Sequence, residues 1–217
     1  HRAEDGRATR NAVDDDVIRG IAASERAVGM ERGRDLAAAA ADDPADLHGM
    51  AKHYETGEPL PEHYYQKLLA ARHYMSGTAM LRQIHFGWLD LELHYRYQPG
   101  GQETAWDVRD RIAKTTTVMP PLPEDAFLCA FGHIFAGGYA AGYYSYYWAE
   151  VLSADAFAAF EEAGLEDEEA IAQTGRRFRD TVLALGGSRH PMEVFKAFRG
   201  REPSTAALLR HRGLVTA

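Results

Sequence analysis

A histidine, two adjacent glycines and several tyrosines lie within one short stretch of the chain, residues 127–151. This stretch has the sequence FLCAFGHIFAGGYAAGYYSYYWAEV, in which His133 stands four residues before Gly137 and Gly138. A histidine and a tyrosine aimed at a carbonyl can stabilise a developing oxyanion, and each well-placed donor contributes about 3–4 kcal/mol. Glycines at such a point let a backbone or a ligand approach closely. The residue types therefore indicate a site for a polar ligand.

Three tyrosines follow the glycines at helical spacing. Tyr139, Tyr143 and Tyr146 stand at i, i+4 and i+7, so a helix over 139–152 would place them on one face. We expect this helix to be buried nearly all round, and buried phenols need hydrogen-bond partners. The same spacing is also typical of an aromatic core. His133 and the two glycines favour the site over the core.

The same stretch resembles a known family. The segment FGHIFAGGYAAGYYSYYWAEVLSADAF is similar to the C-terminal signature of the zinc metallopeptidases that include thimet oligopeptidase, oligopeptidase A and dipeptidyl carboxypeptidase. The resemblance extends over about residues 47–217, and the further segments that carry it are HYETGEPLP at 53–61, AMLRQIHFGWLDLELH at 79–94, GGSRHPMEVFKAFRGREP at 186–203 and LLRHRGL at 208–214. It implies the all-α, C-terminal helical half of a zincin-type oligopeptidase with a deep peptide channel.

The resemblance also implies roles for individual residues. The family's transition-state and substrate contacts fall on His133, Tyr139 and Tyr146. Gly137 and Gly138 match a flexible glycine-rich loop over the peptide channel. Tyr143 matches the substrate-binding pattern as well, although a packing role fits it equally.

Zinc is expected for the family, but its ligands are not identifiable in this chain. The catalytic motif is H-E-x-x-H, in which two histidines one helical turn apart hold the ion and the glutamate activates water. None of the ten histidines is followed by glutamate, so the motif is absent. By its distance from HYETG, Glu31 falls near the family's third ligand, a glutamate, but the flanking residues MERGRD do not match.

Three interpretations remain open, and all of them take short peptides as the ligand. The chain is a truncated or frameshifted zinc oligopeptidase, or a subunit that completes an active site with a partner chain carrying H-E-x-x-H. The third interpretation is a non-catalytic peptide-binding module. We expect this chain alone not to hydrolyse peptides. A purely structural helical scaffold is the alternative from a different class.

Residues 1–46 differ in kind from residues 47–217. The first 46 residues contain no Phe, Tyr or Trp, and Ala, Arg, Asp and Gly dominate them. This composition is typical of a solvated helix or of disorder rather than of a core. We interpret 1–46 as a divergent leader or as the product of a wrong reading frame, and 47–217 as the helical oligopeptidase-like region.

Composition excludes several classes of function. The net charge of −8 argues against a nucleic-acid partner. No apolar run reaches the 18 residues that indicate a membrane span. Cys129 is the single cysteine, which suggests a reducing cytoplasm and a buried thiol.

Helical periodicity and caps predict helices throughout the second region. Met80, Ile84, Trp88 and Leu91 are the expected apolar positions of a long helix over 76–95. Arg199 and Arg201 could recognise a peptide carboxylate or pair with acidic helix faces, and we favour the ion pairs. Further helices are expected over 62–74, 103–114, 154–163, 168–185, 191–198, over 47–54 and between Pro203 and Gly213.

Overall fold

The computed structural model describes residues 51–215. Within this range the chain is helical, and the one β-type pairing is an isolated antiparallel bridge between Lys52 and Pro59. The expected all-α class is confirmed. Glu31 and the leader over 1–46 lie outside the described residues. In the described range, no helix is long and apolar enough to cross a membrane.

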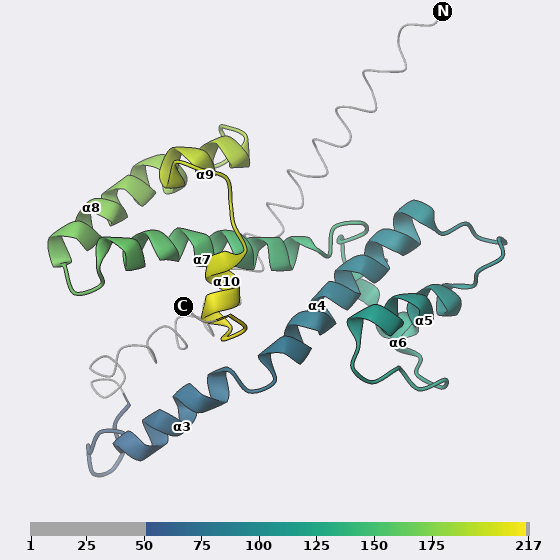
Figure 1. Ribbon diagram of the computed structural model, residues 1–217, viewed down its shortest axis with the longest axis horizontal. Coiled ribbons are helices and arrows are strands. Elements are labelled where there is room, and N and C mark those ends of the chain that lie inside the picture. The colour runs from purple at the N-terminus through teal and green to yellow at the C-terminus, as the bar shows by residue number, and fades with distance from the viewer. Residues whose placement is uncertain (1–50, 216–217) are drawn as a thin grey trace, which may run out of the picture. The chain divides into compact units, whose positions relative to one another are not determined.

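The described chain divides into two compact units, with the boundary after Tyr147. In the N-terminal unit, α3 and α4 follow each other and are separated at Met75, which has a positive φ of 54° (Figure 1). Residues 51–54 are not helical, so the helix expected over 47–54 is wrong there. The elements of this unit are α3 (Glu62–Arg72), α4 (Ser76–Leu91), the π-helical η1 (Glu92–Arg96), α5 (Ala105–Thr116), α6 (Phe127–Ala130) and the 3-10 turn η2 (Gly132–Ile134).

The core of the N-terminal unit forms where α5 packs against α4. Thr104 begins α5 with a capping box, in which its side chain accepts from the N–H of Asp107 and the Asp107 side chain accepts from the N–H of Thr104. This start orients α5 so that its apolar side contacts α4. The buried apolar cluster between them consists of Leu89, Val108, Ile112 and Leu128, and a second cluster consists of Phe86, Phe131 and Ile134.

The face of α4 that is buried is not the expected one. Ile84, Trp88 and Leu91 are each about two-fifths exposed. Phe86, Leu89 and the fully buried Asp90 face the unit's interior instead. The expectation failed because apolar residues recur at helical spacing on two faces of this helix. The face that is buried also carries the polar Asp90, so the sequence pattern did not mark it as the core face.

Cys129 is also exposed rather than buried. It lies on the short helix α6 next to Leu128, and α6 turns the leucine into the core. The thiol consequently points away from the packed side.

The aromatic segment is not one helix over 139–152. Residues 135–144 form turns, and α7 (Ser145–Ala163) begins only afterwards. Gly138 and Ala141 have positive φ values of 84° and 54°, which a right-handed helix cannot contain. The segment is also less buried than expected, since Tyr144 is 44% exposed.

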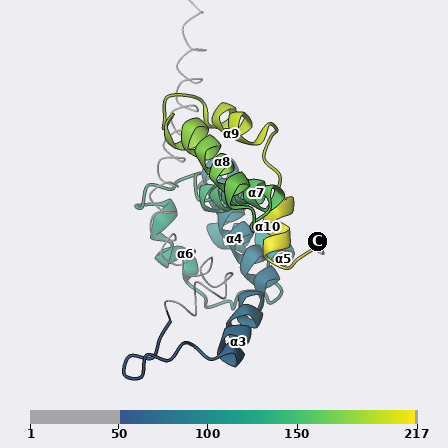
Figure 2. The same cartoon turned by 90° about the vertical axis from the view of Figure 1, so that its left-hand side faces the viewer.

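The C-terminal unit is built on α7 (Figure 1), which continues through 152–154 where two helices were expected. Figure 2 shows the same elements from the left-hand side of Figure 1, so that α7 is seen nearly end-on. The helices expected over 168–185, 191–198 and before Gly213 are confirmed. They are α8 (Glu168–Phe178) with the π-helical η3 (Arg179–Leu183), α9 (Pro191–Arg199) and α10 (Ala206–His211).

Asp155 holds the C-terminal unit together. Its fully buried carboxylate accepts hydrogen bonds from Arg199 Nε at 3.1 Å, from Arg201 Nη1 at 2.7 Å and Nη2 at 2.5 Å, and from the N–H of Ser204 at 2.7 Å. Arg199 also binds Glu162 with both terminal nitrogens. The two arginines therefore pair with acidic groups, as we favoured. Because these bonds engage its carboxylate, Asp155 serves as a helix-interior anchor and not as the start of a separate helix.

Acid should weaken this network. Burial raises the pKa of Asp155, but the hydrogen bonds from Arg201 and Ser204 and the charges of both arginines outweigh it, so the pKa lies below its usual value. A carboxyl whose pKa is lower in the folded state stabilises the fold above its unfolded pKa of about 3.9. This stabilisation is lost as the pH falls through the folded-state pKa.

Asp155→Asn should therefore lower the free energy of unfolding at pH 7 by about 3–5 kcal/mol, because it leaves two arginines without their buried anion. Urea unfolding followed by circular dichroism at pH 7 and pH 3 measures the loss, which should shrink at pH 3. Asp180→Asn is the matched control, since Asp180 is exposed and forms its ion pair with its sequence neighbour Arg179. Equal losses in the two variants would contradict the role of Asp155.

Candidate functional site

The loop 135–144 folds back on the turn that carries His133. The N–H groups of Ala136 and Gly137 both donate to the carbonyl of Gly132 at 2.8 Å, and the N–H of Tyr139 donates to the carbonyl of His133 at 3.1 Å. These bonds bring the residues on either side of the glycine pair together.

Gly137 is required for this close approach. A Cβ at this position would lie 2.8 Å from the Cα of His133 and 2.9 Å from its carbonyl oxygen, distances that real Cβ atoms do not adopt. Gly138 is needed for a different reason, since its positive φ of 84° disfavours any L side chain. Both predicted glycines therefore shape the loop next to His133.

The far end of the loop is held by α4. The Asp90 carboxylate accepts hydrogen bonds from the N–H of Ala141 and the N–H of Tyr143, both at 2.9 Å. Gly87, one turn earlier on α4, lets the loop pass closely, because a Cβ there would lie 3.3 Å from the Cα of Tyr144. The loop backbone is thus fixed from one helix face.

The fold brings the four predicted aromatic residues into one cluster, although not on one face of a helix. The His133 ring centroid lies 6.2 Å from that of Tyr139 and 6.1 Å from that of Tyr143. Tyr146 lies 4.8 Å from Tyr139 and 5.2 Å from Tyr143. Tyr143 also packs edge-on against Phe86 and Phe131, which joins the cluster to the core. We call these four residues, His133, Tyr139, Tyr143 and Tyr146, the His-Tyr cluster.

Two members of the His-Tyr cluster have polar groups that the described chain does not use. His133 is exposed and Tyr139 is half-buried. Within residues 51–215, no side-chain hydrogen bond engages the His133 imidazole or the Tyr139 hydroxyl. Tyr143 differs, since its hydroxyl lies 3.5 Å from Oε1 of Gln83. His133 and Tyr139 can therefore offer a donor or an acceptor to a ligand.

The sequence-based search missed Asp90. The available signal was an acidic residue set among the apolar residues Trp88, Leu89 and Leu91. Its two loop partners stand 51 and 53 residues further along the chain. A sequence pattern within one helix or turn does not reveal a hydrogen bond between residues so far apart along the chain.

The described residues do not fit a zinc ion. Among residues 51–215, no three histidine, cysteine, aspartate or glutamate side chains come together as a metal site would require. Glu31, which the resemblance placed near the third ligand, lies outside this range. No step of chemistry is therefore assigned to a metal here.

His85 has a structural role. Its Nδ1 lies 2.8 Å from the hydroxyl of Thr116, and both side chains are buried between α4 and α5. Burial, together with the charges of Arg82 and Arg109, lowers the pKa of His85. The His85 imidazole therefore joins α4 to α5 through its hydrogen bond with Thr116.

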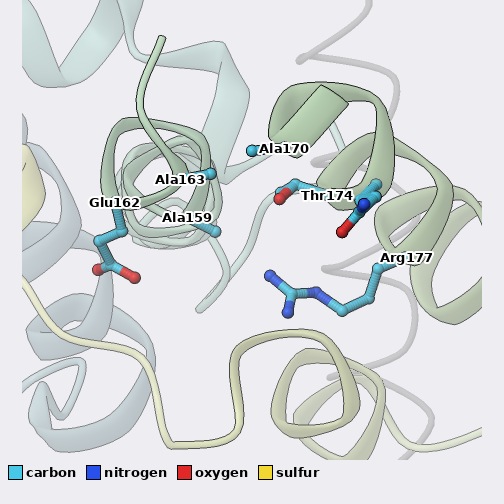
Figure 3. A pocket seen from close by; sticks show the side chains of 7 residues that line it. Ala159, Glu162, Ala163, Ala170, Thr174 and Arg177 are labelled. Atoms are coloured by element: carbon cyan, nitrogen blue, oxygen red, sulfur yellow. The ribbon is translucent and has the colours of Figure 1, made fainter. Parts of the chain in front are cut away.

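A cavity of about 520 Å³ lies between α7 and α8 in the C-terminal unit (Figure 3). None of its lining residues was predicted as a site residue. Glu162, the one carboxylate in the lining, is already bound by Arg199 at 2.7 and 2.8 Å. The cavity consequently lacks a free acid or base, and the His-Tyr cluster remains the better candidate. The lining consists of Ala159, Glu162, Ala163, Ala170, Gln173, Thr174 and Arg177.

Comparison with known proteins identifies relatives over most of the chain. It is 63% identical over 171 residues to a protein named "Probable cytosolic oligopeptidase A" from Arabidopsis thaliana, which covers 79% of this chain and 24% of that protein. It is 47% identical over 172 residues to "Oligopeptidase A" from Escherichia coli, with 79% and 25% covered. Similarity to "Dipeptidyl carboxypeptidase" from Salmonella typhimurium is 31% over 176 residues, with 80% and 25% covered.

The chain spans about a quarter of the length of these curated relatives. Residues 39–214 match the family described as "Peptidase family M3". This match includes the His-Tyr cluster, the glycine pair and Asp90. The resemblance in the sequence is thereby confirmed, and the chain belongs to peptidase family M3.

Proposed function

We propose that this chain forms the substrate-binding part of a zinc-dependent oligopeptidase site and binds short peptides. The His-Tyr cluster is the surface that contacts the peptide. His133, Tyr139 and Tyr146 contact the substrate and its transition state, while Gly137, Gly138 and Tyr143 shape the binding surface. Membership of a peptidase family and the names of the relatives support the ligand class.

The observation that carries the proposal is the unused hydrogen-bonding capacity of His133 and Tyr139. Their rings are fixed by neighbours at 4.8–6.2 Å, while their polar atoms find no side-chain partner in the described range. A peptide carbonyl or amide matches these groups, because it offers both an acceptor and a donor. Flat aromatic rings next to these atoms add apolar contact area.

Hydrolysis requires the H-E-x-x-H motif, which this sequence does not contain. We therefore propose that the chain alone binds peptides without cleaving them. A polypeptide that carries the motif is the partner that would supply zinc and its activated water. A peptide-binding module without any catalytic partner is the alternative.

We also propose a cytoplasmic location, with neither nucleic acid nor membrane as partners. The relative named as cytosolic supports this location, and the acidic net charge of −8 supports the absence of nucleic acid. A second relative, 64% identical, is named as chloroplastic or mitochondrial. An organelle is thus the alternative that cell fractionation would detect.

Tyr139→Phe should weaken peptide binding about fivefold, because one hydrogen bond of about 1 kcal/mol is removed while the ring is kept. Fluorescence anisotropy of a labelled unstructured peptide with the full chain gives the Kd. His133→Ala should weaken binding at least as much. Tyr144→Phe is the matched control, since Tyr144 lies in the same loop, is 44% exposed and is outside the cluster. An unchanged Kd in Tyr139→Phe and His133→Ala would contradict the proposal.

The purified chain should bind peptide without zinc and should leave a quenched fluorogenic peptide intact. Metal analysis after zinc titration, together with the fluorogenic assay, measures both properties. Addition of a polypeptide that carries H-E-x-x-H tests whether the two parts restore cleavage. Stoichiometric zinc with cleavage by the chain alone would overturn the proposed division of roles.

Gly137→Ala should lower peptide affinity about tenfold or more and lower the free energy of unfolding by about 1–3 kcal/mol, because the new methyl group overlaps His133. Anisotropy and urea unfolding measure the two effects. Gly132→Ala provides the control in the same turn, since nothing lies within 4 Å of its added Cβ. If both variants behave alike, close approach at Gly137 is not what shapes the site.

A further inference from the structure

We infer that Asp90 is the positioning residue of the His-Tyr cluster: its buried carboxylate holds the loop 139–143 in the conformation that binds peptide. This inference rests on the proposed function and adds a residue that does not itself touch the ligand. Asp90 acts through the loop backbone.

One face of α4 and its π-helical extension carries three residues that contact the loop. Gly87, Asp90 and His94 stand at i, i+3 and i+7, which places them in a line along the helix. Gly87 gives the loop room at Tyr144, Asp90 binds the backbone at 141 and 143, and the ring of His94 lies 5.9 Å from that of Phe135. The helix therefore contacts the loop at both of its ends.

The carboxylate uses both oxygens for the loop. Oδ1 accepts from the N–H of Ala141 and Oδ2 accepts from the N–H of Tyr143. Two hydrogen bonds from alternate residues fix the loop more rigidly than one bond could, because they hold its backbone at two points. Side-chain exposure of Asp90 is 0%, so water does not compete for these oxygens.

His94 lies beside the Asp90 carboxylate. Its Nδ1 lies 2.9 Å from Asp90 Oδ1 and 2.9 Å from the Asp90 carbonyl oxygen. Since the hydrogen-bonded carbonyl oxygen is an acceptor, we assign the proton to Nδ1, which donates to it. The Asp90 carboxylate thus has two backbone donors, and the His94 ring lies beside it.

The loop conformation needs such an external acceptor. Ala141 adopts a positive φ of 54°, which is unfavourable for any residue with a Cβ. In this conformation, the N–H groups of Ala141 and Tyr143 point toward α4 rather than to a carbonyl of their own turn. The bonds to Asp90 offset the strain and satisfy both donors.

Fixing the backbone at Tyr143 fixes the cluster. The Tyr143 ring contacts His133 at 6.1 Å and Tyr146 at 5.2 Å, so it lies between the histidine and the start of α7. A shift of its backbone would change both ring distances. Peptide affinity should therefore depend on Asp90, which lies outside the cluster.

The test is Asp90→Asn in the full chain, since an amide of the same shape offers one acceptor and places an NH₂ group against the second loop N–H. Hydrogen exchange followed by NMR gives the exchange rates of the amides of Ala141 and Tyr143. We expect both rates to rise about tenfold or more, and the peptide Kd to rise by a similar factor. Helix content by circular dichroism should stay the same.

Asp155→Asn is the matched control, because it is the same substitution at an equally buried aspartate whose partners are Arg199, Arg201 and Ser204. It should lower stability without changing the exchange of 141 and 143 or the peptide Kd. A purely structural role for Asp90 would make the two variants behave alike in peptide binding, and this result would overturn the inference.

Two further results would also overturn it. Unchanged exchange at Ala141 and Tyr143 in Asp90→Asn would show that the carboxylate does not hold the loop. Unprotected amides at 141 and 143 in the wild-type chain would show the same without any variant. Absence of peptide binding by a wild-type chain whose loop amides are protected would instead contradict the proposed function, so the two failures are distinguishable.

Discussion

The Asp90 carboxylate and the loop backbone form the interaction on which the site geometry depends. A loop with positive φ at Gly138 and Ala141 cannot satisfy its N–H groups as a helix does. Burying a carboxylate is costly unless hydrogen bonds compensate. Here the two loop N–H groups donate to the buried carboxylate, so the loop donors and the Asp90 acceptors satisfy each other. The His94 ring lies beside the same carboxylate. These bonds to the loop backbone position the Tyr143 ring against its neighbours in the His-Tyr cluster.

The sequence predicted that the aromatic residues lie together, but it predicted a continuous helix where the structure has a loop followed by α7. The spacing of Tyr139, Tyr143 and Tyr146 is that of a helix face, and the structure gathers their rings by a turn followed by a helix start. Spacing alone cannot separate these cases, because the decisive acceptor lies 51 to 53 residues away. The sequence therefore indicated which rings lie close together, but not the path of the loop that brings them together.

Asp155 shows the same limit in the C-terminal unit. With Ser153 it has the composition of a helix start, yet it lies inside α7 and pairs with two arginines 44 and 46 residues away. The helix starts expected at residues 62, 76, 168 and 191 are confirmed. Pro191 begins α9 as expected, and Asp167 caps α8 through the N–H groups of Glu169 and Ala170. Caps are local, while buried anions take partners from distant parts of the chain.

This difference has a consequence for how the site is built. The contacts that shape the His-Tyr cluster come from residues 83–146, within one unit. In the proposed function, the peptide-contacting groups would therefore be positioned by contacts within this unit. In the proposed function, the metal would act on a peptide that this surface already orients, so binding and cleavage would be lost by separate mutations. Substitution of Asp90 would then affect binding, and substitution in a polypeptide that carries H-E-x-x-H would affect cleavage.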